Sequence, residues 1–512
     1  MGKFLRWSGC LFLLLGCCGL RGYAQEAPVV RTSSGMVQGI QGAGSMSFLG
    51  IPFAAPPVGE LRWQAPRPPA RWDGVRLAQS SGPACPAQIN GDGPRSEAED
   101  CLYLNVYTPE HVGKDAKLPV MIFFHGGANL WGSTSIYDGM RMAEVTHAVV
   151  VMPSYRLGIL GLLDVPGMGD DAGDFMLEDQ LAALRWVQAN VAAFGGDPND
   201  VTVSGQSAGS MDVCDVLASP AAHGLFRQAI LQSGTCQHGL SQKEARLEGE
   251  AYAEKLGCSR ESPLACLRAK PVGELIDGWP GDLRGMRAPA SGGSLLPEAA
   301  EEAIAAGHFL HVPLLIGFTR DELWPFQHAL YPLSESGLQA QFAQRFGAKA
   351  VEAETLYPES AYPHREYALG AAAGDQWMIC GSLQEADEAA KWTRVSVYEF
   401  ADRTAPPFRS RGAAMKRPEG YWPGAFHTAE LQYLYAYQSA EGPLSASQRR
   451  FGDQMMRLWV GFGRESSSAF PVYRQSQRSV LVLGEQGDSV ESSSAVYEAH
   501  HCSFWNSPAK PE

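Results

Sequence analysis

The sequence lacks an excess of positive charge. Of its 512 residues, 41 are Lys or Arg and 55 are Asp or Glu, which gives a formal net charge of −14. Nucleic-acid-binding proteins need a basic face that neutralises phosphates, and binding to an anionic membrane surface needs a polybasic segment. The charge balance therefore argues against both kinds of partner.

The chain also lacks a long apolar run and a long linker. Crossing a bilayer takes about 20 apolar residues, and no uninterrupted run of that length occurs. No Pro/Gly/Ser-rich segment is long enough to divide the chain, and no internal repeat is visible. Hydrophobic residues make up 45% of the chain, which suffices for a large core. We therefore expect a single globular domain over residues 25–512.

The N-terminus has the composition of an export signal. An apolar stretch follows Lys3 and Arg6, and small residues end at Ala24. This pattern predicts a signal peptide over residues 1–24 and hence a secreted or periplasmic protein. A lipoprotein processing site at Cys17 is the competing interpretation.

Three of the 11 cysteines lie in the predicted signal peptide, which leaves eight in the mature chain. An exported protein can oxidise them, but eight cysteines allow 105 pairings, so the connectivity stays open. A bridge between Cys85 and Cys101 would close a loop of about 15 residues, worth about 3 kcal/mol in the chain-entropy model. Isolated buried thiols are the alternative for this pair.

Continuous apolar runs alternate with helical patterns after a Gly- and Pro-rich segment over residues 26–100. Runs of this kind are typical of parallel strands buried on both faces. They occur at residues 118–124, 148–152, 201–203, 229–231, 312–316 and 395–398. Apolar residues at helical spacing over 177–194 predict a helix that ends at Gly195-Gly196. The alternation predicts an α/β fold with a mostly parallel sheet.

The segment Gly205-Gln206-Ser207-Ala208-Gly209 follows one of these strands and precedes an apolar helical stretch. A G-x-S-x-G pattern is weak by itself, but between a strand and a helix it predicts a nucleophile elbow with an exposed serine hydroxyl. The N–H groups at the start of the helix would favour a developing oxyanion. A loop serine between turn glycines is the alternative.

A serine nucleophile needs a histidine base and an acid that orients it. In this fold the order along the chain is nucleophile, acid, histidine. Glu322 lies just beyond a predicted strand and is the candidate acid, with Asp321 as its competitor. His427 lies among small residues before a helical stretch, and it is one of nine histidines after Ser207. The residue pattern alone leaves the choice of histidine open.

Two further motifs bear on the chemistry. His125-Gly126-Gly127-Ala128 follows the strand at 118–124, and its glycines allow backbone N–H groups to turn toward a substrate; a purely structural turn is the alternative. His500 and His501 beside Cys502 suggest a metal site, but paired ligands elsewhere are lacking. We therefore predict no metal.

Together these segments resemble the type-B carboxylesterase and lipase family, the α/β hydrolases that include the cholinesterases. The resemblance covers nearly the whole mature chain, and it points to a secreted member of bacterial type. It is carried by Phe48–Ala54, Glu99–Asn105, Phe194–Pro198, the elbow, Ala229–Gly234 and Phe426–Leu431.

The resemblance implies an α/β-hydrolase fold and a serine esterase that hydrolyses carboxylic esters through an acyl-enzyme. The implied partner is a small-molecule ester, and no cofactor is needed. The resemblance singles out His427 and prefers Glu322 over Asp321. The implied catalytic residues are Ser207, Glu322 and His427, with oxyanion N–H groups from Gly127, Ala128 and Ala208.

The resemblance also implies three disulfides, which are Cys85 with Cys101, Cys258 with Cys266, and Cys380 with Cys502. Cys214 and Cys236 then remain, either as an extra bridge or as free thiols.

The sequence departs from the family at three places. Ala128 replaces a glycine of many relatives beside the expected oxyanion hole, and Leu323 replaces the usual glycine after the acid. The segment between Cys85 and Cys101 contains no tryptophan, so the aromatic platform that holds quaternary ammonium groups by cation–π attraction is missing there. A choline ester is therefore a disfavoured substrate.

Two alternative functions remain at this point. A lipase acting on long-chain acylglycerols would use the same chemistry. A non-catalytic cholinesterase-like binding module would have no use for a serine, an acid and a histidine in the family's order, so their presence argues against it.

Overall fold

The structure is a computed structural model. It describes Gly2 and residues 27–88, 95–113, 115–237, 239–279, 288–407, 420–422, 424–436, 442–464, 470–484, 487–491 and 495–508. The predicted signal peptide at 1–24, with Cys17, lies outside the described residues apart from Gly2.

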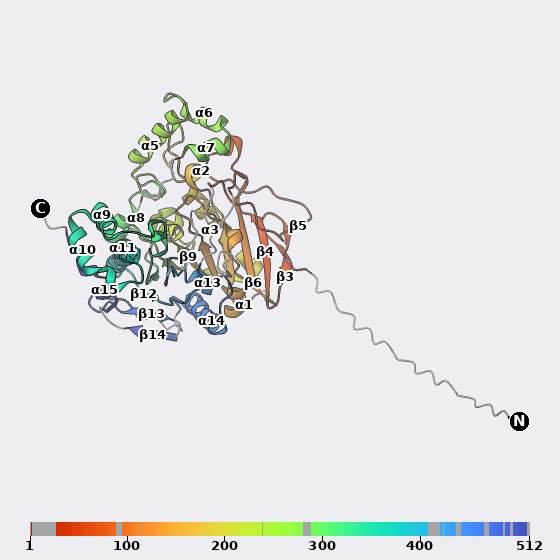
Figure 1. Ribbon diagram of the computed structural model, residues 1–512. Helices are drawn as coiled ribbons and strands as arrows, with labels where there is room; N and C mark the ends of the chain where they lie inside the picture. The colour runs from red at the N-terminus through yellow and green to blue at the C-terminus, as the bar shows by residue number, and fades with distance from the viewer. Residues whose placement is uncertain are drawn as a thin grey trace.

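A large, twisted sheet runs through the molecule (Figure 1). Within the described residues it has eleven strands in the order β14-β13-β12-β11-β10-β9-β7-β8-β6-β4-β3. Strands β8, β7 and β9 to β13 pair in parallel, and the strands at both edges are antiparallel. The strands are β3 (Ile40–Gln41), β4 (Ser45–Pro52), β6 (Tyr103–Pro109), β7 (Leu118–Phe124), β8 (Val149–Pro153), β9 (Gly196–Gln206), β10 (Gln228–Gln232), β11 (Leu314–Thr319), β12 (Val395–Phe400), β13 (Val480–Gly484) and β14 (Gly487–Glu491).

A second, smaller sheet lies near the N-terminus and has the order β1-β2-β5. Its strands are β1 (Val29–Arg31), β2 (Met36–Gln38) and β5 (Val75–Leu77). The described residues of the Gly- and Pro-rich N-terminal segment thus form strands joined by loops.

Helices cover both faces of the large sheet. Helices α3 and α4 pack on one face with α12, and α1 and α14 pack on the other. The α-helices are α1 (Met140–Thr146), α2 (Gly158–Leu162), α3 (Phe175–Asn190), α4 (Ala208–Ala218), α5 (Gln242–Lys255), α6 (Pro263–Ala269), α7 (Val272–Gly278), α8 (Ala300–Ala306), α9 (Glu335–Phe346), α10 (Ala350–Leu356), α11 (Arg365–Gly374), α12 (Cys380–Ala389), α13 (Leu431–Leu434), α14 (Ala446–Gly461), α15 (Ala495–Ala499) and α16 (Cys502–Trp505).

Short turns of 3₁₀- or π-helix join these elements. The 3₁₀ turns are η1 (Gly59–Leu61), η2 (Thr134–Ile136), η3 (Val191–Phe194), η4 (Pro220–Ala222), η5 (Pro325–Leu330), η6 (Gly347–Lys349) and η7 (Glu359–Ala361). The π-helical turn η8 (Asp375–Ile379) continues α11.

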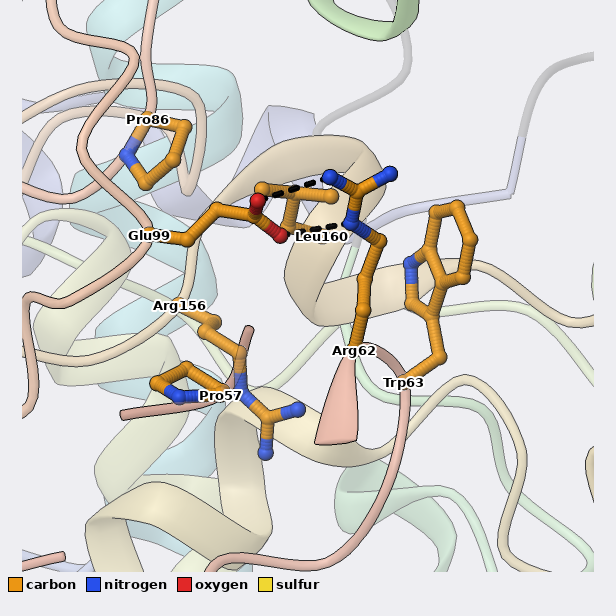
Figure 2. Close-up of a pocket in the computed structure, with 7 residues that line it drawn as sticks. All are labelled: Pro57, Arg62, Trp63, Pro86, Glu99, Arg156 and Leu160. Carbon is orange, nitrogen blue, oxygen red and sulfur yellow. Dashed lines mark hydrogen bonds and ion pairs between the residues drawn. The ribbon is translucent and has the colours of Figure 1, made fainter. Parts of the chain in front are cut away.

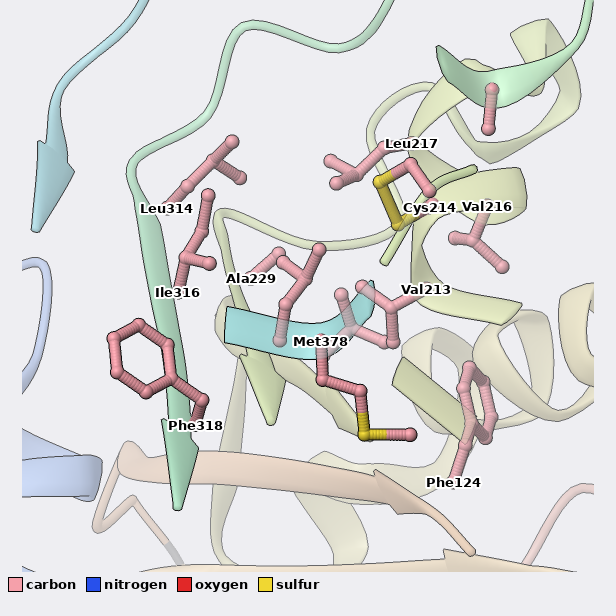
Figure 3. Close-up of a cluster of buried hydrophobic side chains, with 14 of the residues drawn as sticks. Phe124, Val213, Cys214, Val216, Leu217, Ala229, Leu314, Ile316, Phe318 and Met378 are labelled. Carbon is pink, nitrogen blue, oxygen red and sulfur yellow. A yellow bond between two sulfur atoms is a disulfide. The ribbon is translucent and has the colours of Figure 1, made fainter. Parts of the chain in front are cut away.

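The apolar runs form central strands because both of their faces are covered. Val120, Ile122 and Phe124 of β7 belong to the core on the α3/α4 face, whereas Met121 and Phe123 belong to the core on the α14 face. Figure 3 shows part of the first core, where α4 packs on β10 and β11. This two-sided burial confirms the predicted α/β fold.

The predicted helix over 177–194 is divided in the structure. Its first part is α3, and its last turn is the 3₁₀ turn η3. Gly195 follows with φ 84°, a left-handed conformation that glycine adopts without strain. The chain therefore turns directly from this helix into β9.

The eight cysteines of the described residues form four disulfides. Three are the pairs that the family resemblance implies. The fourth joins Cys214 of α4 to Cys236 beyond β10, which settles the pair that the sequence left open. None of the described helices is both long and apolar enough to span a bilayer.

A largely buried ion pair joins two parts of the N-terminal segment, and its arginine also reaches the lobe formed by α5, α6 and α7 (Figure 2). Nε and Nη2 of Arg62 donate to the two carboxylate oxygens of Glu99 at 2.6 and 2.7 Å. Nη1 of Arg62 donates to the carbonyl of Lys270, just after the last residue of α6, at 2.9 Å. One side chain thereby holds the lobe and caps the carbonyl end of its helix.

Candidate active site

Ser207 lies on a sharp turn between β9 and α4, near the middle of the large sheet. Its backbone has φ 58° and ψ −127°, which is strained for a residue with a side chain. The Ser207 N–H donates to the carbonyl of Gln232 at 2.8 Å, and this bond helps to hold the turn. A Cβ added at Gly205 would lie 2.0 Å from the carbonyl oxygen of Gly209. Only glycine therefore permits the strand and the helix to approach so closely.

Glu322 and His427 form a buried pair. His427 Nδ1 lies 2.6 Å from Glu322 Oε2, and both side chains are almost completely buried. The other oxygen, Oε1, accepts from the Thr319 N–H at 2.8 Å. Because the carboxylate is held at both oxygens, it fixes the ring orientation and favours a proton on Nδ1.

Asp321, the competing acid, points elsewhere. Its two oxygens accept from Nη2 and Nε of Arg403 at 2.8 and 2.7 Å. Oδ2 also accepts from the Ala425 N–H at 2.8 Å, and the Asp321 N–H donates to the carbonyl of Ala425 at 2.9 Å. Asp321 thus anchors the loop that carries His427, two residues further along, rather than the imidazole itself.

The second nitrogen of His427 faces the elbow. His427 Nε2 lies 3.2 Å from the amide Nε2 of Gln206, the residue before Ser207. With the proton on Nδ1, Nε2 is an acceptor and the Gln206 amide is the donor. The structure therefore brings Glu322, His427 and the elbow together. Sequence reasoning missed Gln206, although it is the variable position just before the serine in the G-x-S-x-G motif.

The loop after β7 packs directly on the elbow. A Cβ at Gly126 would lie 2.9 Å from Ser207 Cβ, and one at Gly209 would lie 2.3 Å from the carbonyl oxygen of Phe124. Gly127 has φ 125° and Ala128 has φ 54°. Gly126 of this loop therefore lies against Ser207, and Ala208 follows Ser207 as the first residue of α4.

Buried polar residues hold the loop after β7 in place. Asn129 Nδ2 donates to Asp212 Oδ1 at 2.9 Å, and Gln180 Nε2 donates to Asp212 Oδ2 at 2.7 Å. The ring of His125 stacks on Tyr155 with centroids 4.5 Å apart. Burial lowers the pKa of His125 to about 4, so this histidine is neutral at ordinary pH and serves the packing of the loop.

A second buried acid lies close to the pair. Burial, together with the charge of Glu322, raises the pKa of Glu430 to about 8. Near neutral pH Glu430 is therefore mostly protonated. Sequence reasoning missed this residue, although it follows His427 by three positions in Phe426–Leu431.

The histidines and cysteine considered for a metal do not converge on one point. His500 contacts Asp375 Oδ1 through Nδ1 at 2.8 Å and Glu399 Oε1 through Nε2 at 2.9 Å. Cys502 is bridged to Cys380. Elsewhere in the described part of the chain, Cys214, Cys236 and Glu385 lie at ligand-like spacing, but the first two form a disulfide and have no thiolate to offer.

Comparisons with known proteins agree on one family. The sequence model of the carboxylesterase family matches residues 26–505. The chain is 32% identical to pyrethroid hydrolase Ces2e of Rattus norvegicus over 497 residues, covering 89% of this chain and 85% of that protein. It is 35% identical to fumonisin B1 esterase of Sphingopyxis macrogoltabida over 462 residues, covering 85% and 81%.

Among solved structures, a PNB esterase superposes with a TM-score of 0.76 at 30% identity and covers 94% of this chain and 99% of its own. That enzyme, too, is an esterase by name. The matches extend over almost the whole described fold, including the elbow and the segment around His427. The chain therefore belongs to the carboxylesterase family, the α/β hydrolases predicted from its sequence, and is a carboxylic ester hydrolase.

Proposed function

We propose that the enzyme hydrolyses carboxylic esters through an acyl-enzyme formed on Ser207, with His427 as base and Glu322 as its orienting acid. The Ser207 hydroxyl attacks the ester carbonyl carbon while His427 Nε2 accepts its proton. The alcohol then leaves with that proton. Water, activated in turn by His427, attacks the acyl group and restores the serine.

The observation that carries this proposal is the 2.6 Å contact between His427 Nδ1 and Glu322 Oε2, buried and next to the elbow. A buried carboxylate stabilises the imidazolium that forms when Nε2 takes a proton. The Gln206 amide, 3.2 Å from Nε2, must give way to the serine hydroxyl for this transfer. Its position supports the idea that the ring nitrogen points toward the reacting serine.

We assign the oxyanion-binding N–H groups to Gly127, Ala128 and Ala208. The positive φ angles of Gly127 and Ala128 and the contact of this loop with the elbow support the assignment. Ala208 begins α4, where N–H groups lack partners within the helix. Donors fixed before the reaction stabilise the oxyanion without reorganisation.

Replacing Ser207 by Ala tests the proposal. We expect kcat for a nitrophenyl ester to fall by about 10⁴- to 10⁶-fold, because the nucleophile is lost while the binding groups remain. Mass spectrometry of the enzyme after treatment with an organophosphate should show one adduct, on Ser207.

Ser210→Ala is the matched control. Ser210 lies one turn further along α4, is fully buried, and its hydroxyl has no hydrogen-bond partner among the described residues. Its replacement should leave both the activity and the labelling nearly unchanged. Near-full hydrolysis by the Ser207→Ala enzyme would refute the mechanism.

The natural ester is to be found with a panel of substrates. Acyl length and alcohol bulk should be varied, with tertiary alcohols included because Ala128 adds a methyl group at the assigned oxyanion hole. A pyrethroid ester and fumonisin B1 belong in the panel, since two relatives are named for them.

We further propose that residues 1–24 direct export and that the mature enzyme works in an oxidising compartment. Four disulfides within the described residues are compatible with that location. N-terminal sequencing of the mature protein tests the cleavage site near Ala24.

A further inference from the structure

A cavity of about 420 Å³ lies behind the Glu322 loop, outside the ester site. Its walls come from segments far apart in the chain, namely the loop after β11, the end of α10, α11, β12 and α15. The volume falls within the range of about 300 to 1,000 Å³ that is usual for small-molecule sites. The mechanism proposed above does not use this cavity.

Two ion pairs line the cavity, and in each of them the acid is buried and the arginine is partly exposed. Arg403 pairs with Asp321, and the two side chains are 54% and 2% exposed. Arg320 pairs with Glu399, and these side chains are 35% and 2% exposed. In both pairs the guanidinium is therefore the more exposed partner, although Asp321, Glu399 and Asp375 line the cavity as well.

His500 is a third cationic group in the lining. It is buried between Asp375 and Glu399. Burial opposes its protonation, but the charges and hydrogen bonds of these two carboxylates outweigh that effect and raise the pKa of His500 to about 10.

Aromatic side chains supply a flat wall beside the arginines. Trp324 and Tyr362 line the cavity and pack edge to face with ring centroids 5.8 Å apart. The Arg403 guanidinium lies 5.1 Å from the centroid of the Trp324 ring. Arginine with an adjacent aromatic surface suits a flat anion, because the guanidinium forms paired hydrogen bonds with a carboxylate while the apolar body packs on the rings.

Two residues that line the cavity, Asp321 and Asp375, are also next to the groups that position Glu322 and His427. Asp321 lines it and holds the loop of His427 through Ala425. Asp375 lines it as well and follows Gly374, where an added Cβ would lie only 3.2 Å from Glu322 Cβ. A ligand carboxylate that binds the Arg403 guanidinium therefore competes with Asp321, whose carboxylate that guanidinium holds in place.

From this arrangement we propose that the cavity is a second ligand site, for a small carboxylate with an aromatic body, and that its occupation slows catalysis by loosening the hold of Asp321 on the His427 loop. The proposal goes beyond the ester site. The acid released from an aromatic ester belongs to the same chemical class.

Binding is tested with benzoate on enzyme whose ester site has first been blocked by an organophosphate. Isothermal titration calorimetry should show binding of one benzoate per chain. Ala499→Trp places a large side chain at the exposed rim of the cavity and should weaken binding at least about tenfold. Ala371→Leu, which fills the α11 wall, should act in the same direction.

Ala306→Trp is the matched control, because Ala306 is also the exposed last residue of a short helix and lies outside the cavity. This variant should bind benzoate like the unsubstituted enzyme. Absence of binding, or equal binding by the Ala499→Trp and Ala306→Trp enzymes, would overturn the proposal. If the organophosphate fails to label Ser207, the mechanism fails, but the comparison of the two variants still decides whether the cavity binds benzoate.

The coupling is tested by kinetics. Benzoate at saturation should lower kcat by about fivefold, the lower end of typical coupling between sites, with KM little changed. The Ala499→Trp enzyme should lose this response. Purely competitive inhibition that persists in this variant would place benzoate in the ester site and contradict the coupling.

Discussion

At the scale of single residues, two adjacent acids have separate tasks. Glu322 contacts the imidazole of His427, and Asp321 binds the backbone of the loop that carries it. Neighbouring side chains on a tight turn point in different directions, so one acid reaches the ring and the other reaches the loop. Asp321 thus holds the loop of His427, the proposed base, while Glu322 contacts its ring.

Substitution separates these two tasks. Glu322→Gln should lower kcat by about 10⁴-fold, because an amide cannot stabilise an imidazolium and favours the wrong tautomer. Asp321→Asn should cost much less, about tenfold, because an amide oxygen still accepts from Ala425 while only the charge opposite Arg403 is lost. Steady-state kinetics of both variants on one ester provides the measurement, and equal losses would contradict the division.

The sequence alone could not separate these acids. Both follow the same strand, and only the direction of the turn decides which one meets the histidine; the resemblance to the family, not the residue pattern, favoured Glu322. His427 was likewise one of several histidines until the family was considered. Gln206 and Glu430 were missed because their roles depend on what lies opposite them in space.

At the scale of elements, one buried histidine connects the C-terminal helices to the large sheet. His500, just after α15, bridges Asp375 of η8 and Glu399 of β12. The Trp505 indole of α16 also donates to the Tyr357 hydroxyl at 2.8 Å. These contacts attach the helices α15 and α16 to η8, to β12 and to the end of α10.

This contact makes stability depend on pH. Because the folded-state pKa of His500 is raised from 6.5 to about 10, its contribution is fully present below pH 6.5 and is lost as the pH rises toward 10. Three of the acids whose pKa burial raises, Asp174, Glu178 and Glu430, titrate at or below about pH 8. The interval from pH 8.5 to 10 covers the titration of His500. Buried tyrosines add to the fall in stability toward pH 10, because burial raises their pKa while tyrosines of the unfolded chain ionise there. The share of His500 is therefore the difference between the unsubstituted enzyme and a His500 variant.

Urea unfolding at these two pH values measures the effect. The free energy of unfolding should fall across the interval in the unsubstituted enzyme. In His500→Gln, which keeps a polar side chain but cannot carry the charge, the fall should be smaller by the share that His500 contributes. An unchanged slope in the variant would show that other groups cause it.

At the scale of the whole molecule, the disulfides close loops of very different size. Cys380 and Cys502 are separated by 122 positions and Cys258 and Cys266 by 8. In the chain-entropy model, replacing both cysteines by alanine should cost about 5 kcal/mol for the long loop and about 2.5 kcal/mol for the short one. Chemical denaturation of the two double variants tests this ranking, which an equal loss would refute.

Much of the architecture could be predicted, because continuous apolar runs identify strands buried on both faces and the helical spacing identifies the elements between them. The cavity and the His500 contacts could not. The His500 contacts join residues that are 125 and 101 positions apart, and no local sequence pattern predicts contacts over such separations. The bridge between Cys214 and Cys236 escaped for the same reason, since spacing leaves many pairings equally possible.

The contact between Gln206 and His427 joins two points 221 positions apart. A ribosome that has completed only the first half of the polypeptide has made Ser207, the proposed nucleophile, without His427, the proposed base. On the proposed mechanism, a copy that ends before His427 should therefore have no esterase activity.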